Sequence, residues 1–298
     1  MFPAGLRAFE GAVAIVTGGA SGIGRALSEE LARRGSSVVL ADVQAEEAAA
    51  VATSLAASGR SASASTLDVT DFASVKRLVE RVAEEHGRLD FIFNNAGIGV
   101  GGEIRDHTID AWNRIIDVNL RGVVHGVQVA YPIMLRQRFG HIVNTASMAG
   151  LMPAPLSTSY SATKHAVVGL SKALRVEAAG LGVRVSVLCP GVIRTPLLSG
   201  GRYGIFVGAL PEREQREAAL RYFGRFRPMD VGLFAAKVLD QVARNRAIIV
   251  VPAWWKLLWW LDRLSPTLSL VLAGRLVESA RQDLAGGARD GAAPGPRS

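Results

Sequence analysis

The 298-residue chain contains a single cysteine, Cys189, so it cannot form an intrachain disulfide or a cysteine-rich zinc site. This scarcity is typical of a reducing compartment, and we expect a cytoplasmic protein. The chain has no stretch of about 20 uninterrupted apolar residues, so a membrane-spanning helix is not expected. Residues 1–10 also lack the apolar run of a signal peptide.

Runs of like charge are missing as well, although the net charge is +8. The basic residues are nearly all arginines, and they are scattered among acidic residues. Because nucleic-acid-binding proteins gather their basic residues into a patch or stripe, we expect no nucleic-acid partner. Apolar residues make up 49% of the chain, which is enough to fill a large core in one domain or two.

Short apolar runs alternate with helical segments along residues 8–251. The apolar runs predict strands at 12–17, 37–41, 61–67, 89–93, 140–145, 183–188 and 247–251. The segments between them predict helices at 25–34, 44–58, 72–86, 111–138, 160–179 and 230–244. This alternation predicts an α/β fold, a doubly wound Rossmann-type sheet of seven mainly parallel strands with helices on both faces.

A glycine cluster, Gly18 to Gly24, lies between the first strand and the first helix. Glycines let the backbone approach a pyrophosphate, and the helix N-terminus offers it free N–H groups. Asp42 ends the second strand, where a carboxylate can accept both ribose hydroxyls of NAD and would repel the 2′-phosphate of NADP. Taken alone, the glycines also fit a simple tight turn and Asp42 a helix cap. Together they favour NAD over NADP.

Tyr160 and Lys164 are one helical turn apart, so both project from one helix face. A phenol is a weak base at neutral pH, but two nearby positive charges, an ammonium and a nicotinamide, favour the phenolate. Read alone, the pair also fits a solvated helix surface. Ser147 follows the fifth strand and can hold a substrate oxygen. Asn119 lies among apolar residues and either bonds backbone or supports a water chain behind Lys164.

These motifs resemble, in order and spacing, those of the short-chain dehydrogenase/reductase family over residues 11–251. The resemblance implies a catalytic tetrad of Asn119, Ser147, Tyr160 and Lys164. In that tetrad Tyr160 is the general acid/base and Ser147 orients the substrate oxygen. Lys164 bonds the nicotinamide ribose and lowers the pKa of Tyr160, while Asn119 holds a water that relays protons.

The resemblance also implies the residues that bind the dinucleotide. Asp68 contacts the adenine, the segment 94–97 stabilises the sheet beside the cofactor, and the segment 190–195 closes over the nicotinamide. No metal site is expected. The expected cofactor-binding residues are Gly18, Ser21, Gly22, Ile23, Gly24, Asp42, Asp68, Val69, Asn95, Ala96, Gly97, Tyr160, Lys164, Pro190, Gly191, Val192 and Thr195.

The family resemblance places a substrate lid at about 196–229, and this segment is rich in apolar and aromatic residues. Such a lid indicates a hydrophobic substrate, although lid helices also need apolar faces simply to pack. An amphipathic extension follows at 252–285, and residues 286–298 are expected to be disordered. The first helix of the extension is expected to present one broad apolar face, formed by Trp254, Leu257, Leu258, Leu261 and Leu264.

Four tryptophans among residues 254–260 leave two interpretations of this extension open. It is either an interfacial helix that binds a membrane surface peripherally, or an arm that packs on its own subunit or across a dimer. The pattern loosely resembles the tails of the lipid-associated retinol and 17β-hydroxysteroid dehydrogenase branch. Family members are commonly homodimers or homotetramers built from the two long helices, and we expect the same here.

These observations predict an oxidoreductase that transfers a hydride between NAD(H) and a small lipophilic alcohol/carbonyl pair, which is sterol-, retinoid- or long-chain-like. One alternative is an NADPH-dependent 3-oxoacyl-thioester reductase. The other is a non-catalytic dinucleotide-binding protein associated with a membrane.

Overall fold

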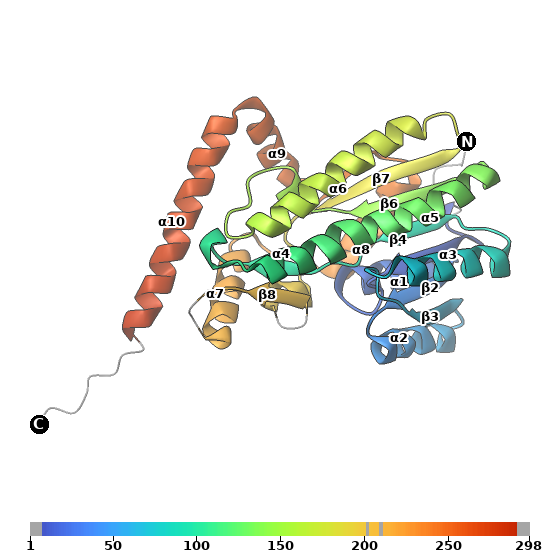
Figure 1. Ribbon diagram of the computed structural model, residues 1–298, viewed down its shortest axis with the longest axis horizontal. Helices are drawn as coiled ribbons and strands as arrows, with labels where there is room; N and C mark the ends of the chain where they lie inside the picture. The colour runs from blue at the N-terminus through green and yellow to red at the C-terminus, as the bar shows by residue number, and fades with distance from the viewer. Residues whose placement is uncertain (1–7, 201–202, 209–210, 291–298) are drawn as a thin grey trace, which may run out of the picture.

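The computed structural model describes residues 8–200, 203–208 and 211–290, and it is built on one seven-stranded parallel sheet (Figure 1). The strand order is β3-β2-β1-β4-β6-β7-β9. All seven predicted strands and the predicted fold class are confirmed. The strands are β1 (Val13–Thr17), β2 (Ser37–Asp42), β3 (Ala62–Thr66), β4 (Phe91–Asn94), β6 (Gly140–Thr145), β7 (Val183–Pro190) and β9 (Ile248–Val251).

Helices cover both faces of this sheet because the strand side chains alternate between two cores. In β1, Val13 and Ile15 enter one core, whereas Ala14 and Val16 enter the other. The first core is closed by α3 (Phe72–His86), α5 (Gly122–Gln137) and α6 (Thr158–Glu177). The second is closed mainly by α1 (Gly22–Arg33), α2 (Ala45–Ala57) and α8 (Val231–Ala243).

The order of the sheet reverses at β1, which pairs with β2 on one side and with β4 on the other. Successive connections therefore leave in opposite directions from the carboxyl ends of β1 and β4. In open α/β sheets such a switch point forms a crevice in which ligands bind.

The predicted helix over 111–138 is present as one continuous helical run, but it contains a turn that was not predicted. It consists of α4 (Ile109–Ile116), a π-helical turn (Asp117–Arg121) and then α5. Wide turns of this kind often lie at functional sites, and this one contains Asn119. A small second sheet was also not predicted, because its strands, β5 (Gly99–Gly101) and β8 (Gly204–Phe206), are only three residues long and glycine-rich.

The segment that follows the sheet forms α9 (Trp255–Leu264) and α10 (Pro266–Asp290), and in Figure 1 α10 runs along one side of the body beside the helix labelled α7 (Glu212–Gly224). The helix α10 therefore continues five residues into the segment 286–298 that was expected to be disordered, while 291–298 lie outside the described residues. Within the described part of the chain, none of the helices is long and apolar enough to cross a membrane.

Candidate active site

A cavity of about 940 Å³ opens at the carboxyl ends of the strands, beside the switch point. Its walls come from the glycine loop, the ends of β2, β4, β6 and β7, the start of α6, the predicted lid and the C-terminal extension. The structure brings together here all the residues that were predicted to bind the cofactor, with the exception of Gly24.

The glycine loop is packed so tightly that side chains cannot be accommodated. A Cβ on Gly24 would lie 1.9 Å from the carbonyl oxygen of Gly18, so Gly24 serves the packing of the loop rather than the cavity wall. Gly18 has a φ of +67°, and a Cβ there would lie 2.9 Å from the backbone of Ala96. Helix α1 begins at Gly22, and the Ser21 side chain makes no capping hydrogen bond at this helix start. The loop and the helix N-terminus therefore suit a dinucleotide phosphate.

Asp42 is a buried carboxylate that borders the cavity. Its Oδ2 accepts a hydrogen bond from the backbone N–H of Ala20 at 3.0 Å, and its Oδ1 accepts one from the N–H of Gln44 at 3.0 Å. The second bond is the cap that was one of the two interpretations of Asp42. Each carboxylate oxygen has two acceptor sites, so both oxygens can still accept from a ribose hydroxyl.

The segment Asn94–Gly97 fastens the end of β4 to the end of β1. The Thr17 hydroxyl accepts hydrogen bonds from the N–H groups of Asn95 and Ala96 at 2.9 and 3.0 Å. The Asn95 amide in turn donates to the Thr17 carbonyl at 3.1 Å. These bonds fix the distance between the carboxyl ends of β1 and β4, which border the crevice. Asp68 also borders the cavity, and its Oδ1 accepts from the N–H and the hydroxyl of Thr70.

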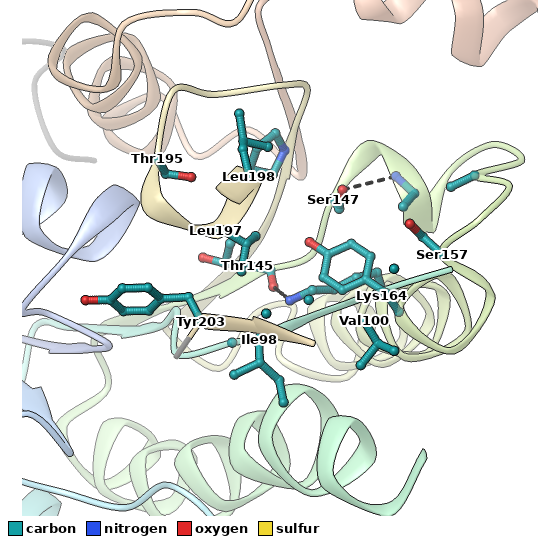
Figure 2. A pocket seen from close by; sticks show the side chains of 18 of the residues that line it. Ile98, Val100, Thr145, Ser147, Ser157, Lys164, Thr195, Leu197, Leu198 and Tyr203 are labelled. Atoms are coloured by element: carbon teal, nitrogen blue, oxygen red, sulfur yellow. Dashed lines mark hydrogen bonds between the residues drawn. The ribbon is translucent and has the colours of Figure 1, made fainter. Parts of the chain in front are cut away.

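Tyr160 lies in the first turn of α6 and Lys164 one turn later. The buried Lys164 Nζ donates to the Thr145 carbonyl at 2.9 Å and lies 5.5 Å from the centre of the Tyr160 ring. The Ser147 hydroxyl accepts from the Ala149 N–H at 3.1 Å. Figure 2 shows Ser147 and Lys164 facing Thr195 and the lid across the cavity.

Burial sets the proton affinities in this cluster. It raises the pKa of Tyr160 to about 12, although a hydrogen bond with Ser147 acts to lower that pKa. Burial also lowers the pKa of Lys164 to about 8. Among the protein's own groups, desolvation of the phenolate therefore has the largest effect on the pKa of Tyr160, and the predicted role of Lys164 toward Tyr160 stays a prediction. The positive charge of a nicotinamide is the remaining contribution that favours the phenolate.

Asn119 is fully buried behind the cavity wall. Its amide accepts from the Ile98 N–H at 2.8 Å and donates to the Ile98 carbonyl at 2.9 Å, which is the backbone-bonding alternative of the two considered. A Cβ on Gly97 would lie 3.2 Å from the Asn119 Oδ1 and 3.5 Å from the Lys164 Nζ. Asn119 and Lys164 therefore approach each other across a glycine.

The C-terminal extension contributes to this cavity, which was not predicted from the sequence. Trp255, Leu258, Leu261, Ser269, Leu272, Ala273 and Leu276 all line it. The expected apolar face of α9 is divided in the structure: Leu258 and Leu261 line the cavity, whereas Leu257 and Leu264 are 72% and 79% exposed. Trp255, which was not assigned to that face, is buried. Helical periodicity shows which residues form an apolar stripe, but it does not show whether that stripe faces the rest of the protein. The role of a backbone acceptor such as the Thr145 carbonyl cannot be predicted from the sequence, because every residue has a backbone carbonyl.

The family model for short chain dehydrogenase matches residues 12–202. The 3-oxoacyl-acyl-carrier-protein reductase of Thermotoga maritima is 35% identical over 218 residues, which is 73% of this chain and 85% of that protein. The cyclohexanol dehydrogenase of Acinetobacter sp. is 39% identical over 192 residues, which is 64% of this chain and 76% of that protein.

Among solved structures, a short chain dehydrogenase/reductase from Burkholderia phymatum in complex with NAD has a TM-score of 0.78 at 34% identity. The match covers 90% of this chain and 96% of that one. The 3-ketoacyl-(acyl-carrier-protein) reductase from Brucella melitensis complexed with NADH has a TM-score of 0.69 at 28% identity, covering 82% of this chain and 97% of that one.

Proposed function

The chain belongs to the short-chain dehydrogenase/reductase family and is an NAD(P)-dependent oxidoreductase, and from this premise we propose that it uses NAD(H) to interconvert a hydrophobic alcohol and its carbonyl. The observation that carries the cofactor choice is the carboxylate of Asp42 at the cavity wall. The negative charge of this carboxylate disfavours the additional 2′-phosphate of NADP.

The substrate class follows from the wall opposite the catalytic residues. Among the described residues, every cavity-lining side chain from Pro190 onward is uncharged, and most are aliphatic or aromatic. A wall without fixed charge favours an apolar molecule over a phosphate or a carboxylate. This supports a sterol-, retinoid- or long-chain-like substrate, as expected of the retinol and 17β-hydroxysteroid dehydrogenase branch.

The chemistry assigned to the protein is proton transfer and positioning. Bound NAD supplies the hydride acceptor at its nicotinamide. Tyr160 removes the proton of the substrate alcohol, and it returns the proton when the carbonyl is reduced. Ser147 donates a hydrogen bond to the same oxygen and stabilises the charge that develops there. The Lys164 ammonium donates to the Thr145 carbonyl, and its proposed role is to bond the cofactor ribose and to favour the Tyr160 phenolate.

A panel of hydrophobic secondary alcohols tests this proposal, with NADH formation followed by fluorescence. We expect turnover with NAD that increases with chain length, and a much lower kcat/KM with NADP. The 35% identical relative named as a 3-oxoacyl-acyl-carrier-protein reductase keeps the thioester reductase as a second candidate. Faster reduction of 3-oxoacyl thioesters with NADPH would favour that candidate instead. Binding of NADH without turnover of any substrate would favour a non-catalytic role.

The exposed side of α9 and α10 supports a peripheral membrane contact. Large apolar side chains are exposed there, including Leu257, Trp260 and Leu264, and α9 itself carries two basic residues and one acidic residue. Tryptophan and basic residues suit the headgroup region of an anionic bilayer, so we include docking on such a surface in the proposal. It would bring the apolar part of the cavity, which the same helices line, close to dissolved lipid.

Flotation with vesicles of phosphatidylcholine and phosphatidylglycerol tests this docking. The variant Leu257→Glu/Leu264→Glu places two charges on the exposed face and should remain at the bottom of the gradient while the wild type floats. Ile109→Glu is the matched control, since Ile109 is 74% exposed on α4, outside the extension, and should float normally. A wild type that never floats but loses a dimer in the double variant would instead assign this face to a second copy of the chain.

A further inference from the structure

The side chain of Trp255 presents a buried hydrogen-bond donor that the described protein does not satisfy. The residue is only 6% exposed, and its indole Nε1 has no hydrogen-bond partner among the described residues. Buried tryptophans normally pair this N–H group, because an unpaired donor loses its bond to water without compensation. Trp255 also borders the cavity, so the unmet donor belongs to a residue of the cavity wall.

The position of this indole is set by the segment that follows β7. The Gly191 N–H donates to the Val251 carbonyl at 2.9 Å, which brings the start of the extension beside Gly191. A Cβ on Gly191 would lie 2.1 Å from the Trp255 Nε1, so the indole occupies the space that a side chain would need. Gly191 belongs to the segment predicted to close over the nicotinamide. The donor is therefore close to the reacting end of the cofactor site.

The surroundings of the indole are apolar. The Trp255 ring lies 5.5 Å from that of Phe226 and 4.5 Å from that of Trp254, and Leu258 lines the cavity on the same helix. The cavity-lining residues that the structure describes in the lid and the extension carry no charge. An anion would lose its hydration here with one neutral donor to replace it, whereas a hydroxyl or ketone oxygen would lose little. A single N–H in such a wall selects a neutral acceptor.

We propose that Trp255 is a specificity-determining residue whose indole N–H binds a second, neutral oxygen of the substrate. The substrate is then an apolar molecule with two oxygen functions. One is the alcohol or carbonyl that reacts at Tyr160, and the other is a hydroxyl or ketone held at Trp255. This inference rests on the proposed function, because it takes the cavity to be the substrate site.

Paired substrates separate this role from packing. The probes are a homologous series of 2-alkanols and the same alkanols with a ketone on the penultimate carbon of the other end. We expect the wild type to prefer the keto-alcohol of matching length by about fivefold or more in kcat/KM, and Trp255→Phe to abolish the preference, mainly through KM. Trp260→Phe, an exposed tryptophan on the same helix, should keep it. Thermal melting confirms that both variants are folded.

The same measurements can contradict the proposed role of Trp255 in several ways. If Trp255→Phe keeps the preference, or lowers kcat/KM equally for both members of each pair, the indole only packs and the proposal is wrong. If the variant instead weakens NADH binding about tenfold, the N–H serves the cofactor and the proposal is equally wrong. If the wild type oxidises none of the alcohols, the proposed function fails. Calorimetric titration of keto-alcohols into wild type and Trp255→Phe then decides the anchor separately, and equal affinities overturn it.

Discussion

Replacing Asp42 by asparagine tests the choice of cofactor at the level of single hydrogen bonds. Both oxygens of Asp42 accept a backbone N–H, from Ala20 and from Gln44. Asparagine offers one oxygen only, so one of these N–H groups loses its acceptor and the glycine loop is weakened. The substitution also removes the negative charge that we propose faces the ribose. The first effect is common to both cofactors, whereas the second differs between them.

The magnitude follows from the number of bonds at stake. Loss of a hydrogen bond to a charged acceptor costs about 1.5–3 kcal/mol, which corresponds to roughly 10- to 150-fold in kcat/KM for NAD. NADP shares the damage to the loop but no longer meets the carboxylate. We therefore expect the ratio of kcat/KM for NAD to that for NADP to fall by at least about tenfold in Asp42→Asn. Steady-state kinetics with both cofactors and one alcohol gives this ratio.

Asp68→Asn is the control for this experiment. Asp68 uses Oδ1 for both of its bonds to Thr70, and an asparagine oxygen can accept the same two bonds. Its cofactor ratio should therefore stay within about twofold of the wild-type value. If Asp42→Asn lowers kcat/KM equally for NAD and NADP, Asp42 acts only as a structural cap, and the reasoning that assigns it to the ribose is refuted.

Three further predictions follow from buried groups. Tyr160→Phe should abolish turnover yet leave NADH binding nearly unchanged by fluorescence titration, and retention of more than a few per cent of activity would contradict its role as the acid/base. Gly191→Ala should raise KM for the alcohol and lower the melting temperature, because the new Cβ would overlap the Trp255 indole; an unchanged melting temperature would show that the indole does not sit there. Burial, together with the nearby Arg184 and Arg175, lowers the pKa of His141 from 6.5 to about 3. In this pH range His141 binds a proton in the unfolded chain but not in the native state, so the free energy of unfolding falls as the pH drops from 6.5 towards 3. His141→Gln should lose less stability over that range in urea titrations, and identical losses would contradict the assignment.

Much of the site was visible in the sequence because its residues lie at the ends of regular elements. The apolar runs end where the sheet ends, so the sequence by itself predicts that Asp42, Asn95 and Ser147 lie at one edge of the sheet. One helical turn of spacing was enough to bring Tyr160 and Lys164 to the same face. The proton affinities were not visible in this way. The high pKa of Tyr160 depends on how completely the surrounding elements exclude water, which no local pattern reports.

The alternation of strands and helices, the glycine loop and the spaced polar residues are local properties, and they determined the parallel sheet and the cofactor crevice. Only the tertiary structure decided what the C-terminal extension does. An amphipathic helix shows which side chains share a stripe, but its rotation on the body depends on the shape it meets. Here that shape is the bare backbone of Gly191, which admits the indole of Trp255 and leaves Leu257 and Leu264 facing outward.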